Sequence, residues 1–266
     1  MSPAVTRKPG GHPRSSRTLG FYAALMYAFL HVPLLILIGF SFNASRFTLW
    51  EGFSWRWYHA VFTDADMADA AWNSAVIAVV STLISTVVGT LAAYALWKRG
   101  SRLLSGSLYL SLVTPEIVTG ISLLAFFQWA FRWLGWRLGL YTVILAHVSF
   151  SIAYVAIVVA SRLRTFDPAL EEAAMDLGAT EWRAFWRVTL PALAPGIAAA
   201  ALLALTISFD DYVITSMVAG VDSTTLPMVI YAMARRGANP SINAISALIV
   251  VAIGAVILVS ERLREA

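Results

Sequence analysis

One polar stretch lies between two apolar segments, and it reads EEAAMDLG over residues 171–178, ATEWRAFWR over 179–187 and VTLP over 188–191. Asp167 can cap a helix ahead of it, with Pro168 at the first helical position, where the missing N–H costs nothing. Gly178 suits the left-handed residue that ends a helix, and Thr180 can cap a second helix. The stretch therefore predicts two short helices joined by a turn, the second of which ends at Leu190-Pro191.

The second of these helices has an aromatic face, since Trp182, Phe185, Trp186 and Thr189 recur at helical spacing. One interpretation is an amphipathic linker that lies on a membrane surface. The full spacing also resembles the EAA loop of ABC-importer permeases, with Val188 where isoleucine is usual. The resemblance implies docking to a cytoplasmic ATPase by the matching residues, which are Glu172, Ala173, Ala174, Gly178, Leu190 and Pro191.

The composition is that of a membrane protein: of 266 residues, 59% are hydrophobic and 13% are charged. Five windows without Asp, Glu, Lys or Arg exceed the roughly 20 residues that cross a bilayer; they cover residues 19–43, 70–97, 138–161, 188–209 and 237–260. A sixth, 103–131, is interrupted only by Glu116, and Pro115 beside it predicts a kink or a break. We therefore expect an all-α polytopic membrane protein with six transmembrane helices.

The expected domain organisation follows from these windows. Residues 1–18 are predicted to be a disordered cytoplasmic tail, although a basic stretch before an apolar run also occurs in secretory signals. Residues 19–69 hold the first transmembrane helix and an external loop. Residues 70–262 form the transmembrane domain, with a cytoplasmic loop at 162–191 and spans at about 71–97, 104–128, 138–161, 193–217 and 242–260. In the second span, small residues on one face favour close helix contact: Ser74, Ser81, Ser85, Gly89 and Ala93.

Lysine and arginine are unevenly distributed between the two sides of this topology. With a cytoplasmic N-terminus, 13 of the 19 cations lie inside, and those outside are Arg46, Arg56, Arg132, Arg137, Arg235 and Arg236. Cytoplasmic loops carry the excess of such residues, so both termini and the 162–191 loop are predicted to be cytoplasmic. The net charge of +4 then reflects topology, and no basic soluble face indicates nucleic-acid binding.

Several kinds of chemistry find no support in the sequence. The chain has no cysteine, which excludes disulfides and thiolate nucleophiles. The histidines show no metal-ligand spacing, and His147 is interpreted as a helix-contact residue rather than a ligand. No Gly-x4-Gly-Lys-Ser/Thr loop is present, so ATP hydrolysis is expected on another chain. We expect neither a catalytic residue nor a metal on this chain, and it is interpreted as a transport subunit.

Two adjacent acids near the end of the fifth span, Asp210 and Asp211, are the candidates for cargo binding. Carboxylates are costly in hydrocarbon unless they face protein, water or a cation. Phe209 and Tyr212 flank them and can attract an ammonium group by cation–π interaction. Glu116, in the third span, is a further candidate for the pathway. The alternative is that all three acids have merely reached the membrane interface. A separate choice concerns the aromatic residues of the 43–69 loop, which form either an interfacial belt or a docking surface for an extracytoplasmic partner.

A second resemblance concerns cargo. Residues 208–218, 225–227 and 237–244, together with 114–124, are similar to the spermidine/putrescine branch of ABC-importer permeases, closest to the putrescine type. This sequence differs from that branch at Ser241, where an acid is common, and at Tyr212, where an aliphatic residue is common. The resemblance implies a type I (MetI-like) fold in the bacterial inner membrane. It also implies a second similar permease, two cytoplasmic ATPase subunits that bind ATP and Mg, and an extracytoplasmic binding protein, with membrane lipid around the chain and no cofactor on it.

Three other functions remain as alternatives. The first is the same transporter class with another organic cation or small solute as cargo. A stand-alone ion-coupled carrier also uses intramembrane acids, but it commonly shows internal repeats and does not need the 162–191 loop. An intramembrane aspartyl protease needs carboxylates that face each other from separate elements, which two adjacent residues on one helix do not provide.

Overall fold

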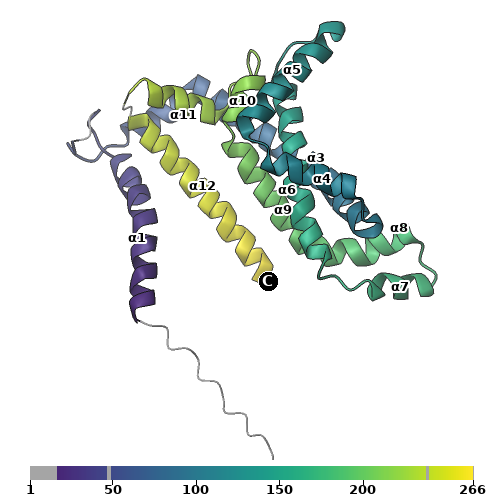
Figure 1. The fold of residues 1–266 in the computed structure, drawn as a ribbon. Helices are drawn as coiled ribbons and strands as arrows, with labels where there is room; N and C mark the ends of the chain where they lie inside the picture. Colours follow the sequence, from purple (N-terminus) through teal and green to yellow (C-terminus); the bar gives the residue numbers. More distant parts are fainter. Residues whose placement is uncertain (1–16, 47–48, 238–239, 266) are drawn as a thin grey trace, which may run out of the picture. The chain divides into compact units, whose positions relative to one another are not determined.

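The computed structural model describes residues 17–46, 49–237 and 240–265, so nearly all of the predicted disordered tail lies outside them (Figure 1). The described residues form helices and one isolated β-bridge, between Asn43 and Phe53. This confirms the all-α prediction. The chain divides into two units: residues 1–60 with 238–257, and residues 61–237 with 258–266.

The first unit holds α1 (Arg17–Phe40), the start of α2 (Arg56–Thr63) and most of α12 (Pro240–Glu265). The second holds α3 (Ala65–Arg99), α4 (Arg102–Val113), α5 (Glu116–Leu134), α6 (Leu140–Leu163), α7 (Ala169–Asp176), α8 (Glu181–Ala184), the π-helix η1 (Phe185–Thr189), α9 (Leu190–Asp210), α10 (Val213–Val218) and α11 (Leu226–Arg235).

Within the described residues, five helical segments are long and apolar enough to cross a membrane by length and composition. They are Leu19–Phe40, Ala65–Arg99, Glu116–Leu134, Leu140–Leu163 and Glu181–Asp210. Residues 240–255 of α12 form a shorter apolar helix, as α4 and α11 do. The count of six spans therefore stays a prediction.

In the first unit, the chain after α1 folds back on itself through Asn43. The Asn43 side chain donates to the Leu49 carbonyl and accepts from the Glu51 amide, and Trp57 donates its indole N–H to the Asn43 carbonyl at 2.7 Å. The neighbouring rings of Phe42, Phe53, Trp55 and Tyr58 form one aromatic cluster. This loop is thus an ordered structure, which fits either an interfacial belt or a docking surface.

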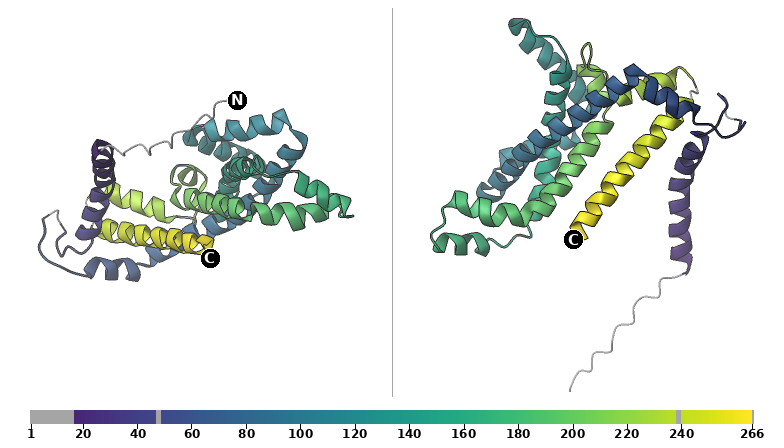
Figure 2. Two further views of the ribbon diagram at one scale, coloured as in Figure 1. Left: turned by 90° about the horizontal axis from the view of Figure 1, so that it is seen from below. Right: turned by 180° about the vertical axis from the view of Figure 1, so that it is seen from behind.

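The core of the second unit is formed by α3, α6 and α9, which pack side by side (Figures 1 and 2). The predicted small residues of α3 are buried, and a Cβ on Gly89 would lie 2.7 Å from the Val155 side chain of α6. No side chain larger than hydrogen fits there, so the two helices approach closely at Gly89. Of the short helices, α7 and α8 lie at one end of α9 and α10 lies at the other (Figure 1).

The third predicted span is two helices rather than one. Proline disfavours helical geometry in the residue before it, and Thr114 accordingly has the extended angles φ −66° and ψ 126°. Helix α4 ends at Val113 and α5 begins at Glu116, so the interruption expected at Pro115 is a full break. Helix α5 then continues to Leu134, beyond the expected end at residue 128.

The fifth span differs from the prediction at both ends. Leu190-Pro191 does not end the preceding helix, because α8, η1 and α9 run on as one helical segment, Glu181–Asp210. A proline ring crowds the carbonyl four residues earlier, and the wider π turn directly before Pro191 makes room for it. At the other end, a single helix over 193–217 is wrong: Asp211 is extended, with φ −66° and ψ 125°, and separates α9 from α10.

Candidate functional site

The 162–191 loop folds locally as the capping residues predict. The Asp167 side chain accepts a hydrogen bond from the Ala169 amide at 3.0 Å, which caps α7. Gly178 has φ +89°, the left-handed geometry expected after a helix. Thr180 accepts from the Arg183 amide at 3.3 Å and caps α8. The first predicted short helix is therefore present as α7, whereas the second, α8, is the start of the continuous segment Glu181–Asp210.

The residues that match the EAA loop fall into two places. Glu172, Ala173 and Ala174 lie on α7, with Gly178 in the turn that follows, and all except the half-buried Ala174 are exposed. Leu190 and Pro191 lie instead at the start of α9, beyond the π turn.

The aromatic residues of the second short helix do not share one environment. Phe185 and Thr189 are buried, whereas Trp182 and Trp186 are 64% and 50% exposed. Leu177, at the end of α7, is 91% exposed. Large apolar side chains on a polar loop are typical of a surface that another molecule covers.

A buried carboxylate lies behind this surface. Glu171 is only 2% exposed, and its side chain forms an ion pair with Lys98 at 2.5 Å. It also accepts hydrogen bonds from the hydroxyls of Tyr94, at 3.1 Å, and Thr189. Burial alone raises the pKa of the Glu171 carboxyl, but the hydrogen bond from Lys98, and then that from Thr189, outweigh it and hold the pKa below its ordinary value. The carboxylate is therefore charged at neutral pH.

The candidate cargo acids lie at the opposite end of α9 from this loop. At 1.5 Å per residue, Asp210 is about 30 Å along the helix from Leu190, about the thickness of the hydrocarbon core. Asp210 is exposed, and the described residues give it neither a hydrogen bond nor an ion pair. Its carboxylate is thus available to a cation that approaches this end of the helix.

Asp211 has a different environment, because it caps the helix that follows. Its carboxylate accepts hydrogen bonds from the amide and the hydroxyl of Thr215, both at 2.7 Å. The Nε2 atom of His147 lies 3.4 Å from the same carboxylate, and the Asp211 side chain is 7% exposed. Asp211 therefore holds α10 in place and has little surface left for cargo.

His147 connects this break to two other helices. Its buried ring contacts the Ser208 hydroxyl at 2.7 Å and the Thr215 hydroxyl at 2.9 Å. Ser208 in turn contacts the Ser81 hydroxyl at 2.9 Å. The expectation that His147 serves helix contact agrees with this geometry, because its ring links α6 to α9 and α10.

The other candidate pathway residues are Tyr212, Phe209 and Glu116. The ring of Tyr212 lies 4.2 Å from that of Tyr231, and the guanidinium of Arg235 lies 5.1 Å from the Tyr231 ring. Phe209 is half-buried next to Asp210. Glu116 is exposed at the first position of α5, where a carboxylate suits the helix dipole. A role for these residues in the pathway stays a prediction.

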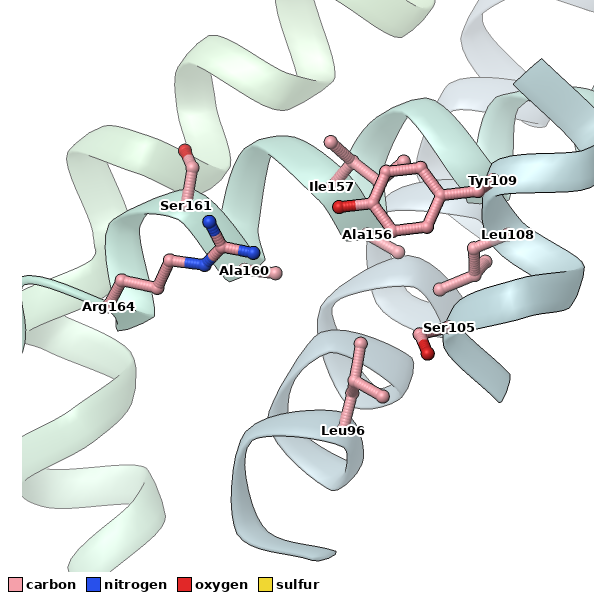
Figure 3. A pocket seen from close by; sticks show the side chains of 9 residues that line it. All are labelled: Leu96, Ser105, Leu108, Tyr109, Ala156, Ile157, Ala160, Ser161 and Arg164. Atoms are coloured by element: carbon pink, nitrogen blue, oxygen red, sulfur yellow. The ribbon is translucent and has the colours of Figure 1, made fainter. Parts of the chain in front are cut away.

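A small cavity of about 130 Å³ lies between α3, α4 and α6 (Figure 3). Apolar side chains form much of its wall, among them Leu96, Leu108 and Ile157, and Arg164 is its one charged residue. A site with an arginine and no carboxylate does not suit a cationic cargo. Among the described residues, no group of three or more His, Asp or Glu side chains could hold a metal ion.

Two pairings were not foreseen from the sequence, Lys98 with Glu171 and His147 with Asp211. Each joins residues that are more than 60 positions apart, so no local spacing indicates them. The available signal was a charged or polar residue inside or beside an apolar span, which marks a residue in need of a partner without saying which one.

Comparison with known proteins gives three findings. Residues 85–266 match the family described as "Binding-protein-dependent transport system inner membrane component". The chain is 44% identical over 239 residues to the putrescine transport system permease protein PotI of Escherichia coli strain K12, covering 87% of this chain and 85% of the relative. It is 38% identical over 241 residues to the spermidine/putrescine transport system permease protein PotC of Haemophilus influenzae, covering 89% and 92%.

Solved structures of ABC transporters share the fold. A bacterial transporter involved in alginate import matches with a TM-score of 0.72 at 18% identity, over 94% of this chain and 96% of that chain. The methionine transporter MetNI in an inward-facing conformation matches with a TM-score of 0.65 at 19% identity, over 76% and 97%.

Proposed function

Because the chain belongs to the family of inner-membrane components of binding-protein-dependent transport systems, we propose that it is the permease subunit of an ATP-driven polyamine importer. The chain is a transport component rather than an enzyme. The observation that carries the cargo assignment is the 44% identity to a putrescine permease over 87% of the chain. The Asp210 carboxylate, which is exposed and has no ion pair among the described residues, agrees with a cationic cargo. Another organic cation is the alternative cargo.

The proposed partners follow from the exposed surface of the 162–191 loop. Glu172, Leu177 and Trp182 are exposed there, and we assign this face to a cytoplasmic ATPase. Two such ATPases would bind ATP and Mg, since the sequence contains no Gly-x4-Gly-Lys-Ser/Thr motif. A second, similar permease would complete the pathway, and an extracytoplasmic binding protein would deliver the cargo. In this arrangement both termini are cytoplasmic.

Motion reaches the cargo acids through one continuous helix. Glu181–Asp210 is a single 30-residue segment that begins beside the ATPase-facing surface and ends at Asp210. A rigid helix of this length spans about 45 Å. Displacement of α7 and α8 by the ATPases would therefore tilt or shift the end of α9 that carries Asp210. Such a movement would expose the cargo site to one side of the membrane and then to the other, which is alternating access.

The two adjacent acids divide the work in this proposal. Asp210 contacts the cargo directly, with Phe209 and Tyr212 beside it for cation–π attraction. Coulomb attraction between a carboxylate and an ammonium group is about 4 kcal/mol at 4 Å and an effective dielectric constant of 20, which replaces part of the hydration that a polyamine loses. Asp211 positions the chain at the break, and Glu116 is a weaker contact.

The test compares Asp210→Asn with a matched acid on the same side of the chain. Asp222 is exposed in the loop after α10 and has φ +65°, which asparagine tolerates well, so Asp222→Asn is the control. The variants are assembled with the partner subunits in proteoliposomes, and uptake of labelled putrescine is measured alongside ATP hydrolysis. Asp210→Asn should import much less putrescine while ATP hydrolysis continues, and Asp222→Asn should match the wild type. Normal uptake by Asp210→Asn would contradict a direct role for this carboxylate.

A further inference from the structure

Glu171 and Glu172 are adjacent on α7 but face different surroundings. Glu172 is exposed, and the described residues give it neither a hydrogen bond nor an ion pair. Glu171 points inward and is 2% exposed. The outward residue belongs to the proposed ATPase-docking surface, whereas the inward one is buried against Lys98, Tyr94 and Thr189 of this chain. Its role must therefore lie within the permease.

The partners of Glu171 come from two other elements. Lys98 and Tyr94 lie one turn apart near the end of α3, and Thr189 is the last residue of the π turn. Helix α7 packs on α8 and η1, and the Glu171 side chain reaches across to Lys98 and Tyr94 of α3. One carboxylate thus joins three segments: α7, the π turn and the end of a core helix.

The surroundings keep this joint charged and well oriented. The Lys98 ammonium also lies 5.0 Å from the Trp97 ring and 5.8 Å from the Tyr94 ring, which restricts its position. The Tyr94 ring lies 4.6 Å from that of Phe185, so its hydroxyl is held toward Glu171. Charge-assisted hydrogen bonds of this kind are shorter and stronger than those between neutral groups. These interactions therefore hold α7 against α3 more firmly than an apolar contact of the same size would.

We propose that Glu171 is a positioning residue for transport, which ties the ATPase-facing helix α7 to α3 so that the two move together. This inference rests on the proposed function, because it assumes that ATPases displace α7. Motion would then enter the transmembrane core by two routes, along α9 through the continuous helix and along α3 through the Glu171–Lys98 pair. Both helices pack against α6, so they would shift the core as a unit.

The first test measures coupling in the reconstituted complex as the number of putrescine molecules imported per ATP hydrolysed. Glu171→Gln and Lys98→Gln should lower this ratio about fivefold or more, the lower end of measured couplings between sites. Tyr94→Phe keeps the ring contact with Phe185 and should lower it less. Arg99→Gln is the matched control, because Arg99 is exposed beside Lys98 and has no ion pair among the described residues. If import and ATP hydrolysis fall in parallel, with an unchanged ratio, the proposal is wrong.

A charge exchange separates a specific pair from general damage. Glu171→Lys places two cations together, and Lys98→Glu places two carboxylates together, so each should lower the ratio strongly. The double variant restores opposite charges, and the hydroxyls of Tyr94 and Thr189 can accept from a lysine as well as donate to a carboxylate. The double variant should therefore exceed both single variants. A double variant no better than the worse single variant would count against the pair.

A third measurement does not depend on the cargo. This chain has no cysteine, so spin labels can be attached at Arg99→Cys on α3 and Asp176→Cys on α7 without a competing site on the chain, which is labelled before it is assembled with its partners. The distance between the labels should stay the same in nucleotide-free and ATP-bound complexes, and should change or broaden when Glu171→Gln is added. A large ATP-dependent change without Glu171→Gln would overturn the proposal even if the cargo is not a polyamine. Failure of the wild type to import any polyamine would instead contradict the proposed function.

Discussion

The two adjacent acids, Asp210 and Asp211, should differ strongly in how much the protein is destabilised when each is replaced by alanine. Asp211 caps α10 and accepts two hydrogen bonds from Thr215 at 2.7 Å, while His147 lies 3.4 Å away. Loss of an N-cap side chain costs about 0.5–2 kcal/mol, and a hydrogen bond to a charged group is worth about 1.5–3 kcal/mol. Asp211→Ala should therefore lower the free energy of unfolding by about 2–4 kcal/mol.

Asp210→Ala provides the contrast at the neighbouring position. Asp210 is the last residue of α9, where a negative charge opposes the helix dipole, and it has no partner among the described residues. Its replacement should change the free energy of unfolding by no more than about 0.5 kcal/mol. Asp211→Asn should lie between the two, because asparagine caps a helix about as well as aspartate but carries no charge.

The difference is measured as the midpoint temperature of thermal unfolding of the purified protein. Samples are heated, and the fraction that remains folded is determined by size-exclusion chromatography. One kcal/mol moves the midpoint of a 150–250-residue domain by about 2–4 °C, so Asp211→Ala should lower it by roughly 5–15 °C. The midpoint of Asp210→Ala should stay within a few degrees of the wild type. Equal midpoints for the two alanine variants would refute the division of roles between these acids.

Three further predictions concern topology, the turn after α7 and the third span. In intact cells, single cysteines at Ser2 and Thr180 should be protected from impermeant thiol reagents while one at Asp222 reacts, and external labelling at Thr180 would contradict the orientation. Gly178→Asp should abolish transport and weaken ATPase association while the protein still inserts in the membrane. No described neighbour blocks a side chain there, but φ +89° strains a residue that has a Cβ, and the new charge lies on the surface assigned to the ATPase. Glu116→Gln should reduce polyamine uptake less than Asp210→Asn does, and an equal or larger loss would place Glu116 at the main contact.

The sequence predicted those features whose physical causes are local. Gly178 and Thr180 lie within a few residues of the helix ends that they fix, and Pro115 acts on the residue next to it. The transmembrane helices follow in the same way from long uncharged runs. Capping and hydrophobicity therefore account for much of the all-α fold.

The features that were missed depend on contacts across the fold or on unusual helix geometry. Neither glycine nor proline marks the break at Asp211, which is stabilised by hydrogen bonds from Thr215 and by His147 on another helix. Pro191 was interpreted as a helix end because a proline clashes with the preceding turn of an α-helix. The preceding turn is a π turn instead, which accommodates the proline ring, and the sequence does not indicate this. No residue near Glu171 in the sequence indicates its buried ion pair, because its partners lie on α3 and η1.

Uptake of labelled putrescine into proteoliposomes tests the central claim most directly. The chain is assembled with its second permease, its ATPase subunits and the loaded binding protein, and uptake is followed with ATP on the cytoplasmic side. The account predicts that putrescine accumulates and that accumulation requires ATP and the binding protein. An excess of spermidine should inhibit putrescine uptake, whereas neutral and anionic solutes should not. An assembled complex that hydrolyses ATP and yet accumulates no polyamine would contradict it.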